Sequence, residues 1–592
     1  MKYCGRISFM ATNELVKVDR VTFTYERGPT ALKDVSFTIN RGEVIAVMGA
    51  NGAGKTTLCF HLNGVIPMVY AGTEKGKITV ADLDPWETPI IELSQHVSMV
   101  LQDPESQFVT NDVKSELAFG PANLAVPKDE ILDRIDFASK VCGLEGLHER
   151  RPADLSGGQK QRVAFGAGLT MLPDLLVLDE PTSQLDPVGT AEVLDTLNGL
   201  TKEEDLSIVI TSHKTEKVAE FADRVIVLNE GELVETGSPR EVFSHVEKLD
   251  SIGVNPPQVT ILCKRLADKI PGFEEQYQRR GGIPITLDEA YDFLTDLLDQ
   301  GFIKIDWKEP PKYEQPSEET VLETSDLVHV YEGREPVTAL RGVDIDIKKG
   351  EIVSIIGQNG SGKTTLVKHF LGLLDATEGE VNALGNDVSK MTTGELAKTI
   401  QLILQNPDFQ LFSISAEKEI RFGLENLKLP EEEIEKRVDD ALKRANLEDK
   451  REIFPFRLSF GNRRQLAAAA GIAMGPEILI LDEPTTAQDY RGRHRICQIA
   501  KDMQKEDKTI LMISHDMELM ATYAPRTIVL ADGKKVADAP TREVFGMHDI
   551  MEQADITPPQ ISQLAEKLKD YGIKDLLLTV DEMVDVIERG GA

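Results

Sequence analysis

Two short segments of the chain have the residue types and spacing of phosphate-binding loops: GANGAGKTT (49–57) and GQNGSGKTT (357–365). Each follows a β-branched apolar run and precedes a helix-forming stretch. In this context glycines let backbone N–H groups turn toward a β-phosphate, and the next helix adds its positive dipole end. The alternative, a glycine-rich turn that binds no ligand, is disfavoured because both segments match the phosphate-loop pattern completely. The residues expected to bind nucleotide are Gly49, Asn51, Gly52, Gly54, Lys55, Thr56 and Thr57, and Gly357, Asn359, Gly360, Gly362, Lys363, Thr364 and Thr365.

Two adjacent carboxylates end a buried-strand pattern in each half of the chain, in LLVLDE (175–180) and ILILDE (478–483). At the tip of such a strand the aspartate can hold Mg²⁺ through water, together with the first loop threonine, and the glutamate can polarise an attacking water. A solvated turn is the alternative, which the neighbouring phosphate-loop motif disfavours. The expected metal ligands are Thr56, Asp179, Thr364 and Asp482, and the glutamates are Glu180 and Glu483.

Four histidines recur at matching places. His213 and His515 follow the β-runs SIVIT and ILMIS, and together with the other motifs they are assigned to the γ-phosphate. A single histidine in such a place is more often structural, so this assignment depends on the other motifs. His61 and His369 lie six residues after the loop lysines on the same helix and are predicted to be packing residues.

The motifs recur because the chain is a tandem repeat. VLDEPTSQLDP (177–187) returns as ILDEPTTAQDY (480–490), and NPPQV (255–259) as TPPQI (557–561). The offset is 363 − 55 = 308 for the lysines, 482 − 179 = 303 for the aspartates and 515 − 213 = 302 for the histidines. A nearly constant offset indicates duplication of a whole unit. The drift from 308 to 303 places about five additional residues in the first copy, near 66–76.

The elements that must position these residues are predicted to form two α/β domains, each followed by a short helical tail. Each tail opens with a proline pair and has apolar residues at helical spacing, at 256–270 and 558–572, and ends with a second predicted helix, at 286–298 and 579–590. A segment rich in proline and glutamate, 308–320, reads as an extended linker. The predicted parts are an N-terminal extension (1–12), domain 1 (13–246), tail 1 (247–303), a linker (304–320), domain 2 (321–548) and tail 2 (549–592).

Composition limits the possible functions. The 592 residues include 66 basic and 99 acidic ones, a net charge of −33, which disfavours nucleic acid although a local basic patch could exist. The five cysteines have no metal-binding spacing and are expected to be buried small apolar groups in a reducing cytosol. No apolar run reaches the roughly 20 residues that cross a bilayer, no signal-peptide core follows Met1, and Met10 is an equally good start.

Taken in order, the phosphate-binding loop, LSGGQ (155–159), LDEPTSQLD (178–186) and the late histidine resemble the nucleotide-binding domain of an ATP-binding-cassette (ABC) ATPase. The resemblance covers nearly all of both copies and implies tandem P-loop NTPase domains, each with a helical signature subdomain, that use ATP and Mg²⁺. It implies that Gln102 and Gln405 contact Mg²⁺ and the attacking water. It also implies that Tyr25 and Tyr331 stack on adenine, with an ordinary strand aromatic as the alternative for each tyrosine.

The same resemblance implies that the two domains pair head-to-tail as an intramolecular pseudo-dimer, because each ATP lies between one domain's phosphate loop and the other's signature. The second signature reads LSFGN (458–462), so Phe460 and Asn462 stand where the first has Gly157 and Gln159. The signature residues implied to contact ATP are Ser156, Gly158 and Gln159, and Ser459 and Gly461.

The altered signature predicts unequal sites. Phenylalanine cannot adopt at low cost the positive φ values open to glycine, and it adds bulk beside the phosphate. We expect the site that combines Lys363 and Glu483 with Ser156 to be the more active one. The site that faces LSFGN is expected to be slower or mainly ATP-holding, with sequence drift of no kinetic consequence as the alternative.

Further segments resemble the ATPases of energy-coupling-factor importers, including cobalt and nickel systems: QDPESQFVT (102–110), QNPDFQLFS (405–413), FGPANL (119–124), FGLENL (422–427) and the PPQ tails. That resemblance implies a motor subunit at the cytoplasmic face of the membrane, bound to a transmembrane coupling protein and a small substrate-binding membrane protein. Phe108, Phe409 and Phe412 could line the groove for the partner's coupling helices or pack internally.

Two other classes of protein stay open. A twin-domain sugar-importer ATPase shares the duplication but does not predict the PPQ tails. A soluble ABC ATPase acting on ribosomes or nucleic acid would bring a long charged inter-domain segment, basic surfaces or N-terminal cysteine clusters. The cargo is undetermined among a vitamin, a vitamin precursor and a transition-metal ion, because recognition in this group is implied to lie in another subunit.

Overall fold

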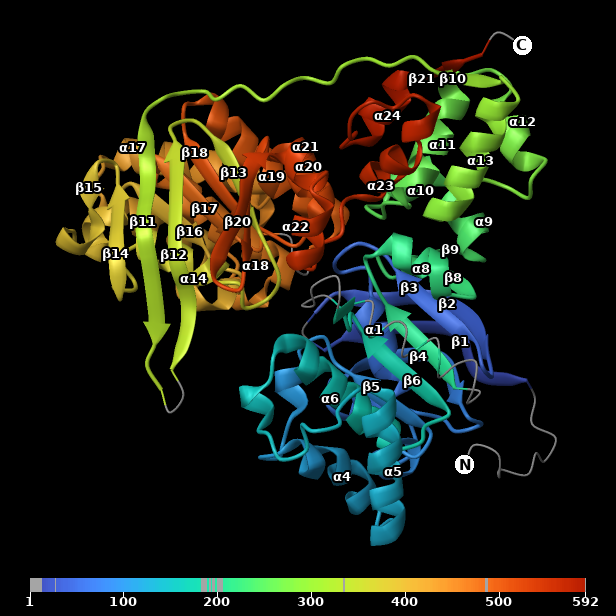
Figure 1. The fold of residues 1–592 in the computed structure, drawn as a ribbon. Coiled ribbons are helices and arrows are strands. Elements are labelled where there is room, and N and C mark those ends of the chain that lie inside the picture. The colour runs from blue at the N-terminus through green and yellow to red at the C-terminus, as the bar shows by residue number, and fades with distance from the viewer. Residues whose placement is uncertain are drawn as a thin grey trace. The chain divides into compact units, whose positions relative to one another are not determined.

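The computed structural model describes residues 13–590, except 27, 183–188, 191–192, 194–196, 198, 200–205, 334–335 and 485–487. The predicted N-terminal extension, 1–12, therefore lies outside the described residues, and so does Cys4. The chain divides into two compact units, Met1–Ala290 and Tyr291–Ala592 (Figure 1).

The central sheet of unit 1 contains β3 (Val44–Met48), β5 (Val97–Val100), β6 (Leu175–Asp179), β7 (Ser207–Thr211), β8 (Arg224–Asn229) and β9 (Glu232–Gly237). Their order is β5-β6-β7-β3-β8-β9, and every neighbouring pair is parallel except β8 and β9. The strands β3, β6 and β7 are buried at every position. Such continuous apolar runs are typical of parallel strands covered on both faces.

A second, antiparallel sheet of unit 1 has the order β2-β1-β4. Its strands are β1 (Glu14–Tyr25), β2 (Thr30–Asn40) and β4 (Gly72–Val80). The helices of this domain are α1 (Lys55–Leu62), α2 (Val65–Met68), α3 (Ile90–Leu93), α4 (Val113–Asn123), α5 (Lys128–Val141), α6 (Gly157–Thr170), α8 (Thr215–Phe221) and α9 (Pro239–Ser244). The tail begins with α10 (Val246–Ser251), α11 (Gln258–Lys269), α12 (Phe273–Gln278) and α13 (Leu287–Asp299).

Unit 2 repeats this architecture. Its central sheet contains β13 (Ile352–Ile356), β16 (Ile400–Ile403), β17 (Ile478–Asp482), β18 (Thr509–Ile513), β19 (Arg526–Ala531) and β20 (Lys534–Pro540). The order β16-β17-β18-β13-β19-β20 matches that of unit 1 strand for strand. The antiparallel sheet contains β11 (Thr320–Tyr331), β12 (Val337–Lys348), β14 (Glu378–Ala383) and β15 (Asn386–Asp387). The predicted tandem α/β fold is confirmed.

The helices of unit 2 fall into three groups. The first surrounds the phosphate loop and the signature: α14 (Lys363–Phe370), α15 (Thr393–Leu396), α16 (Ala416–Asn426), α17 (Glu431–Ala445) and α18 (Phe460–Ala473). The second covers one face of the sheet: α19 (Tyr490–Lys505), α20 (Met517–Tyr523), α21 (Thr541–Phe545) and α22 (His548–Gln553). The third is the tail: α23 (Gln560–Lys567) and α24 (Val580–Val586).

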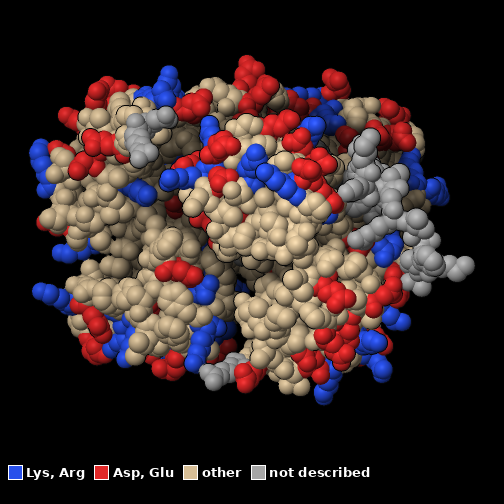
Figure 2. Space-filling model, turned by 90° about the horizontal axis from the view of Figure 1, so that it is seen from below, with Lys and Arg blue, Asp and Glu red and all other residues tan. Residues whose placement is uncertain are grey.

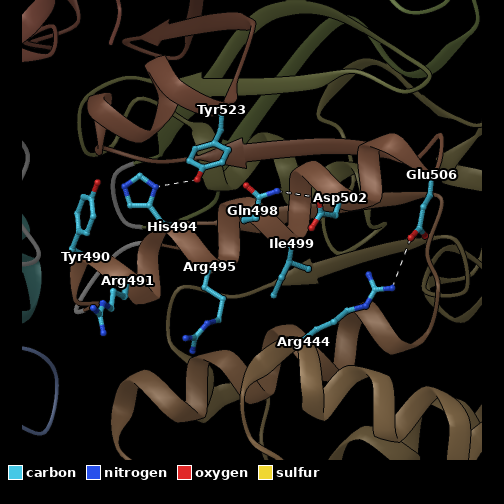
Figure 3. Close-up of a pocket in the computed structure, with 10 residues that line it drawn as sticks. All are labelled: Arg444, Tyr490, Arg491, His494, Arg495, Gln498, Ile499, Asp502, Glu506 and Tyr523. Carbon is cyan, nitrogen blue, oxygen red and sulfur yellow. Dashed lines mark hydrogen bonds and ion pairs between the residues drawn. The ribbon is translucent and has the colours of Figure 1, made fainter. Parts of the chain in front are cut away.

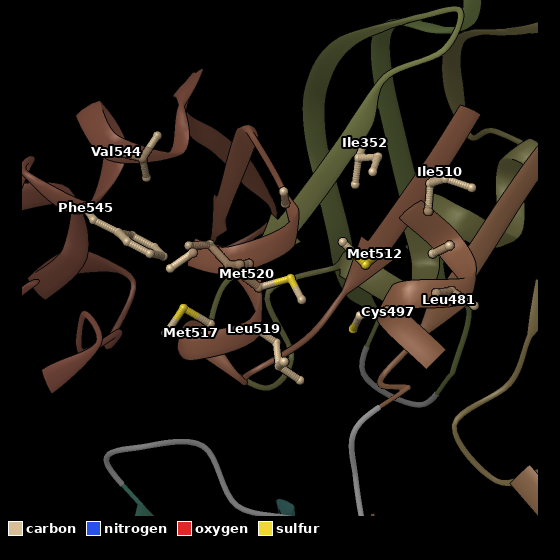
Figure 4. Packing of buried hydrophobic residues seen from close by; sticks show 14 of the residues in the cluster. Ile352, Leu481, Cys497, Ile510, Met512, Met517, Leu519, Met520, Val544 and Phe545 are labelled. Carbon is tan, nitrogen blue, oxygen red and sulfur yellow. The ribbon is translucent and has the colours of Figure 1, made fainter. Parts of the chain in front are cut away.

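The second group packs on the sheet through a sulfur-rich core (Figure 4). Met512 of β18, Cys497 of α19 and Met517 and Met520 of α20 are buried there beside Phe545. Flexible thioethers fill irregular space between a sheet and helices. The four cysteines among the described residues, Cys59, Cys142, Cys263 and Cys497, are free and buried, as predicted.

The tails begin as predicted, because α11 and α23 each start directly after the proline pair. Their ends differ from the prediction. Tail 2 was predicted to be helical to residue 590, but α24 stops at Val586 and β21 (Ile587–Arg589) follows. This strand pairs antiparallel with β10 (Ile303–Ile305), so the start of the predicted linker is also a strand. Main-chain pairing between these two short segments outweighs the helical pattern.

The extra residues of the first copy are also located. Gly76 and Gly379 occupy equivalent positions, with φ of +92° and +84° and with the carbonyl oxygens of 19–20 and 325–326 where a Cβ would lie. Counted from the loop lysines, these glycines lie at 76 − 55 = 21 and 379 − 363 = 16. The difference of five confirms the predicted insertion near 66–76, which overlaps α2. No helix among the described residues is long and apolar enough to span a bilayer.

Candidate functional site

Each predicted phosphate-binding loop follows the central strand of its sheet and ends at a helix that starts with the loop lysine. The first glycine of each loop cannot be replaced by a larger residue. Gly49 and Gly357 both have φ of +149°, and an added Cβ would lie 2.2 Å from Leu228 O and 2.1 Å from Leu530 O, respectively. The close packing of loop and neighbouring strand therefore requires glycine.

The loop lysines are buried and curl over their own loops. Lys55 Nζ donates to Gly49 O at 2.9 Å, and Lys363 Nζ donates to Gly357 O at 2.7 Å and to Gln358 O at 2.9 Å. An ammonium group held by carbonyl oxygens in this way is available to phosphate oxygens that enter the loop.

The first threonine of each loop meets the strand-end aspartate. Thr56 Oγ1 donates to Asp179 Oδ2 at 2.7 Å, and Thr364 Oγ1 donates to Asp482 Oδ2 at 3.2 Å. Burial raises the pKa of both aspartates. A hydroxyl and a carboxylate within reach of each other are the hard oxygen ligands that Mg²⁺ prefers when phosphates and waters complete its shell. The donor set therefore fits Mg²⁺ in both domains.

The glutamate of the first domain lies beside a histidine and a lysine. Glu180 Oε1 is 2.9 Å from His213 Nε2 and 3.9 Å from Lys55 Nζ. Burial alone would raise the pKa of Glu180, but His213 and then Lys55 outweigh it and lower that pKa to about 2. The carboxylate is therefore ionised at neutral pH.

The second domain has the same residue types, but burial and the neighbouring groups shift the pKa of its glutamate in the opposite direction. His515 Nε2 lies 3.1 Å from Glu483 Oε1 and also 3.0 Å from Asn359 Oδ1 of the phosphate loop. Burial raises the pKa of Glu483 to about 8, because Lys363 only partly offsets the desolvation of its carboxylate. Of the two glutamates, Glu483 is the stronger base.

Both glutamates follow their strands in the left-handed region, each with φ of +48°. This conformation is costly for a residue with a side chain, at about 1–3 kcal/mol, and persists only where surrounding contacts hold it. In the first domain the hydroxyl of Thr211 accepts from Glu180 N–H at 2.8 Å and donates to Asp179 Oδ1 at 2.7 Å. In the second domain Glu483 N–H donates to Ile513 O at 2.8 Å.

The remaining predicted contacts lie around these centres. Gln102 and Gln405 follow β5 and β16, which run parallel to the carboxylate strands and end at the same edge of the sheet. The hydroxyls of Tyr25 and Tyr331 lie 3.0 Å and 3.2 Å from the second loop threonines, Thr57 and Thr365. The tyrosines therefore lie beside the phosphate-binding loops, and their stacking on adenine stays a prediction.

Each signature begins a helix, so its serine is an N-cap. Ser156 and Gln159 form a reciprocal capping box, whereas Ser459 Oγ accepts from Asn462 N–H without the reverse contact. Neither Gly157 nor Phe460 has a positive φ, because both are first residues of helices. The expected conformational cost of phenylalanine at this position is therefore wrong, and what remains is the bulk of Phe460, which lies against Arg463.

The aromatic residues near the glutamine segments are not internal in the second domain. Phe409 and Phe412 are 82% and 60% exposed, and Phe422 is exposed beside Phe412. In the first domain Phe108 is half-buried, while Val109 and Phe119 are exposed. The second domain therefore presents the larger apolar surface.

Other surface features lie apart from these centres. A groove of about 680 Å³ runs along α19, between Tyr490 and Glu506, and none of the predicted site residues lines it (Figure 3). On the face seen in Figure 2, acidic and basic side chains of the described residues are interspersed. His61 and His369, predicted to pack, are buried behind the loops.

Some neighbours of the site were not predicted from the sequence. Thr211 and Arg464 contact the strand-end carboxylate segments, and both differ between the copies, where Ile513 and Gln161 stand in their places. Comparing the copies position by position would have singled them out. Part of the segments 177–187 and 480–490 lies outside the described residues.

Comparison with known proteins agrees with this geometry. The ABC transporter family pattern matches residues 32–183 and 340–486. An ABC transporter ATP-binding protein of Methanosarcina mazei is 36% identical over 97% of both chains, and one of Caldanaerobacter subterraneus is 34% identical over 98% of this chain and 100% of its own. A solved structure described as cbiO1 of Clostridium perfringens, part of the transporter complex cbiONQ, is 36% identical and covers 40% of this chain and 96% of its own, with a TM-score of 0.37. The family pattern and the two relatives show that the chain belongs to the ABC transporter family, as an ATP-binding protein with two ATPase domains that hydrolyses ATP.

Proposed function

We propose that the chain is the motor subunit of an energy-coupling-factor type importer at the cytoplasmic face of the membrane. It couples ATP hydrolysis to uptake of a vitamin, a vitamin precursor or a transition-metal ion through separate membrane subunits. The observation that carries this proposal is the exposed aromatic surface of Phe409, Phe412 and Phe422, next to Gln405. A soluble protein rarely exposes several large aromatic residues together unless they bind a partner.

The partner chemistry follows from this surface. An apolar coupling helix of a transmembrane protein would bury these rings, and the glutamine segment beside them would sense the closure of the nucleotide site. The PPQ tails and the segment QNPDFQLFS favour the energy-coupling-factor group, in which a small membrane protein recognises the cargo. We propose no nucleic acid partner, because the net charge of −33 repels polyanions.

In the proposed mechanism, each ATP lies between one domain's phosphate loop and the other domain's signature. Lys55 and Lys363 bind the phosphate oxygens, and Glu180 and Glu483 polarise the attacking water, with His213 and His515 toward the γ-phosphate. Mg²⁺ held by Thr56 and Asp179, or by Thr364 and Asp482, with Gln102 or Gln405 beside it, would neutralise charge on the phosphates. Catalysis then depends on positioning and electrostatics.

The sites are proposed to be unequal. The site with Lys363, Glu483 and Ser156 is the more active one, because the signature expected to face it has Gly157 where the altered signature has the bulky Phe460.

Expression of the chain together with candidate membrane partners tests the proposal. A complex containing a transmembrane coupling protein and a small binding protein should take up the bound cargo into vesicles only with ATP. Recovery of the chain with ribosomes or with a sugar permease would contradict the proposal.

A further inference from the structure

In the first domain the residues Asp179 and Glu180, at the end of β6, form the catalytic turn. A hydroxyl group from the neighbouring strand β7 holds this turn. Thr211 lies opposite Asp179 in the pairing of β6 and β7 and is fully buried. Its Oγ1 donates to Asp179 Oδ1 at 2.7 Å and accepts from Glu180 N–H at 2.8 Å. One side chain therefore fixes both the aspartate and the strained backbone of the glutamate.

The second domain cannot use this arrangement. Ile513 takes the place of Thr211, opposite Asp482 in the pairing of β17 and β18, and its side chain has no donor. Instead, Arg464 of α18 donates through Nη2 to the carbonyl oxygen of Glu483. Arg464 has no exposed surface, so this contact is made inside the protein.

The residue equivalent to Arg464 in the first domain is Gln161, since 464 − 161 = 303. Gln161 is 2% exposed, and its Nε2 has no hydrogen-bond partner among the described residues. Gln161 and Arg464 are therefore both buried on their signature helices. Among the described residues, a contact from this position to the backbone of the glutamate is seen only for Arg464.

A buried guanidinium is costly unless anionic or polar groups surround it. Burial lowers the pKa of Arg464 to about 10, while the carboxylates of Glu483 and Asp482 oppose that effect. The side chain therefore stays charged at neutral pH. A hydrogen bond from a charged donor is stronger than one from a neutral donor.

A second polar link joins the same helix to the same segment. Gln488, which is buried, donates through Nε2 to Gly461 O at 3.3 Å. Gly461 belongs to the altered signature, and the residue equivalent to Gln488 is Leu185, whose side chain cannot donate. The domain with the altered signature therefore also has a polar connection between that signature and its catalytic segment.

We propose that Arg464 is a positioning residue that holds the Glu483 turn in place of the missing threonine hydroxyl and couples it to the LSFGN signature. Since α18 begins at that signature, a movement of Ser459 against ATP shifts Arg464 and with it Glu483. ATP bound under the altered signature thus regulates hydrolysis at the other site. The regulatory step rests on the head-to-tail pairing in the proposed function.

The positioning role is tested in a chain whose first site is silenced by Glu180→Gln. Arg464→Gln, which installs the residue of the first domain, should lower kcat about 10- to 100-fold with the KM for ATP changed less than about twofold. Adding Ile513→Thr, which supplies the hydroxyl of Thr211, should restore most of kcat. Gln161→Ala is the matched control and should leave kcat within about twofold.

A measurement without nucleotide complements the kinetics. Hydrogen exchange of the Glu483 amide, which donates to Ile513 O, should become about tenfold faster in Arg464→Gln and return toward the parent value with Ile513→Thr. Unchanged exchange and unchanged kcat would overturn the positioning role. A lower melting temperature with unchanged kcat, or a failure of Ile513→Thr to rescue, would also overturn it.

The coupling is tested by a double-mutant cycle of Ser459→Ala and Arg464→Gln on kcat in the same silenced background. If Arg464 transmits the state of the signature, Ser459→Ala lowers kcat in the parent and has no further effect beside Arg464→Gln. Additive losses would overturn the coupling and leave the positioning role standing. Failure of the importer proposal would appear separately, as absence of a membrane partner while both kinetic results hold.

Discussion

Acidification is expected to destabilise the first domain through His61, the buried histidine of α1. His61 Nδ1 accepts a hydrogen bond from Trp86 Nε1 at 2.9 Å, and burial lowers the pKa of His61 from 6.5 to about 4. A group with a lower pKa in the folded state binds fewer protons there, so protonation favours unfolding. The stabilising contribution is complete above about pH 6.5 and disappears as the pH falls toward about 4.

The size of the effect follows from the same values. The difference between 6.5 and about 4, at about 1.4 kcal/mol for each pH unit, corresponds to about 3 kcal/mol of unfolding free energy. Since α1 starts at Lys55, the loss should also impair the first phosphate loop.

Urea unfolding of the full chain, followed by Trp86 fluorescence, measures this effect. The chain has two tryptophans, so Trp307→Phe leaves Trp86 as the only reporter. Between about pH 7 and about pH 4 the parent should lose about 3 kcal/mol more than His61→Gln, whose amide can still accept from Trp86. His369→Gln, the matched change in the second domain, should behave like the parent. Identical pH dependence in the parent and His61→Gln would refute the reasoning.

Three other predictions concern the sites and the partner surface. Glu483→Gln should reduce steady-state ATP hydrolysis about 100-fold, while Glu180→Gln should leave most of it; equal losses in phosphate release would refute unequal sites. Gly49→Ala should cost about 1–3 kcal/mol of stability and prevent ATP binding at the first loop, because its Cβ would lie 2.2 Å from Leu228 O; an unchanged melting temperature would contradict this. Phe409→Ser should weaken co-purification with the membrane partner about tenfold at an unchanged basal ATPase rate, and undiminished recovery would count against the docking surface.

Local motifs predicted the site well because each carries its own geometry. A glycine-rich turn that directly follows a buried strand must lie at the end of that strand. Lys55 and Lys363 therefore lie, as predicted, where the turn meets the next helix. The sequence predicted an α/β sheet in each domain but not the order of its strands, because it does not show which apolar strand lies beside which. The nearly constant offset predicted duplication of a whole unit, and the two domains do share one strand order.

The errors have identifiable physical causes. Phe460 was expected to need a positive φ, but Ser459 caps a helix and the residue after it needs only an ordinary helical φ. The second tail was expected to stay helical, but its last residues pair with β10, a strand at the start of the predicted linker. The role of Arg464 was not predicted because Arg464 and Ile513 lie far apart in the sequence and both contact Glu483 only in the folded domain.

The pairing of β10 with β21 affects what happens if the polypeptide is cut. Residues 309–318 connect two segments of unit 2. Just before this stretch, Asp306 N–H donates to Val586 O. A protease that cleaves within 309–318 would break the chain into two fragments. The strand β21, at the end of the C-terminal fragment, would still pair with β10, at the end of the N-terminal fragment. The nicked product should therefore migrate as two bands in denaturing gels and as one species in native ones.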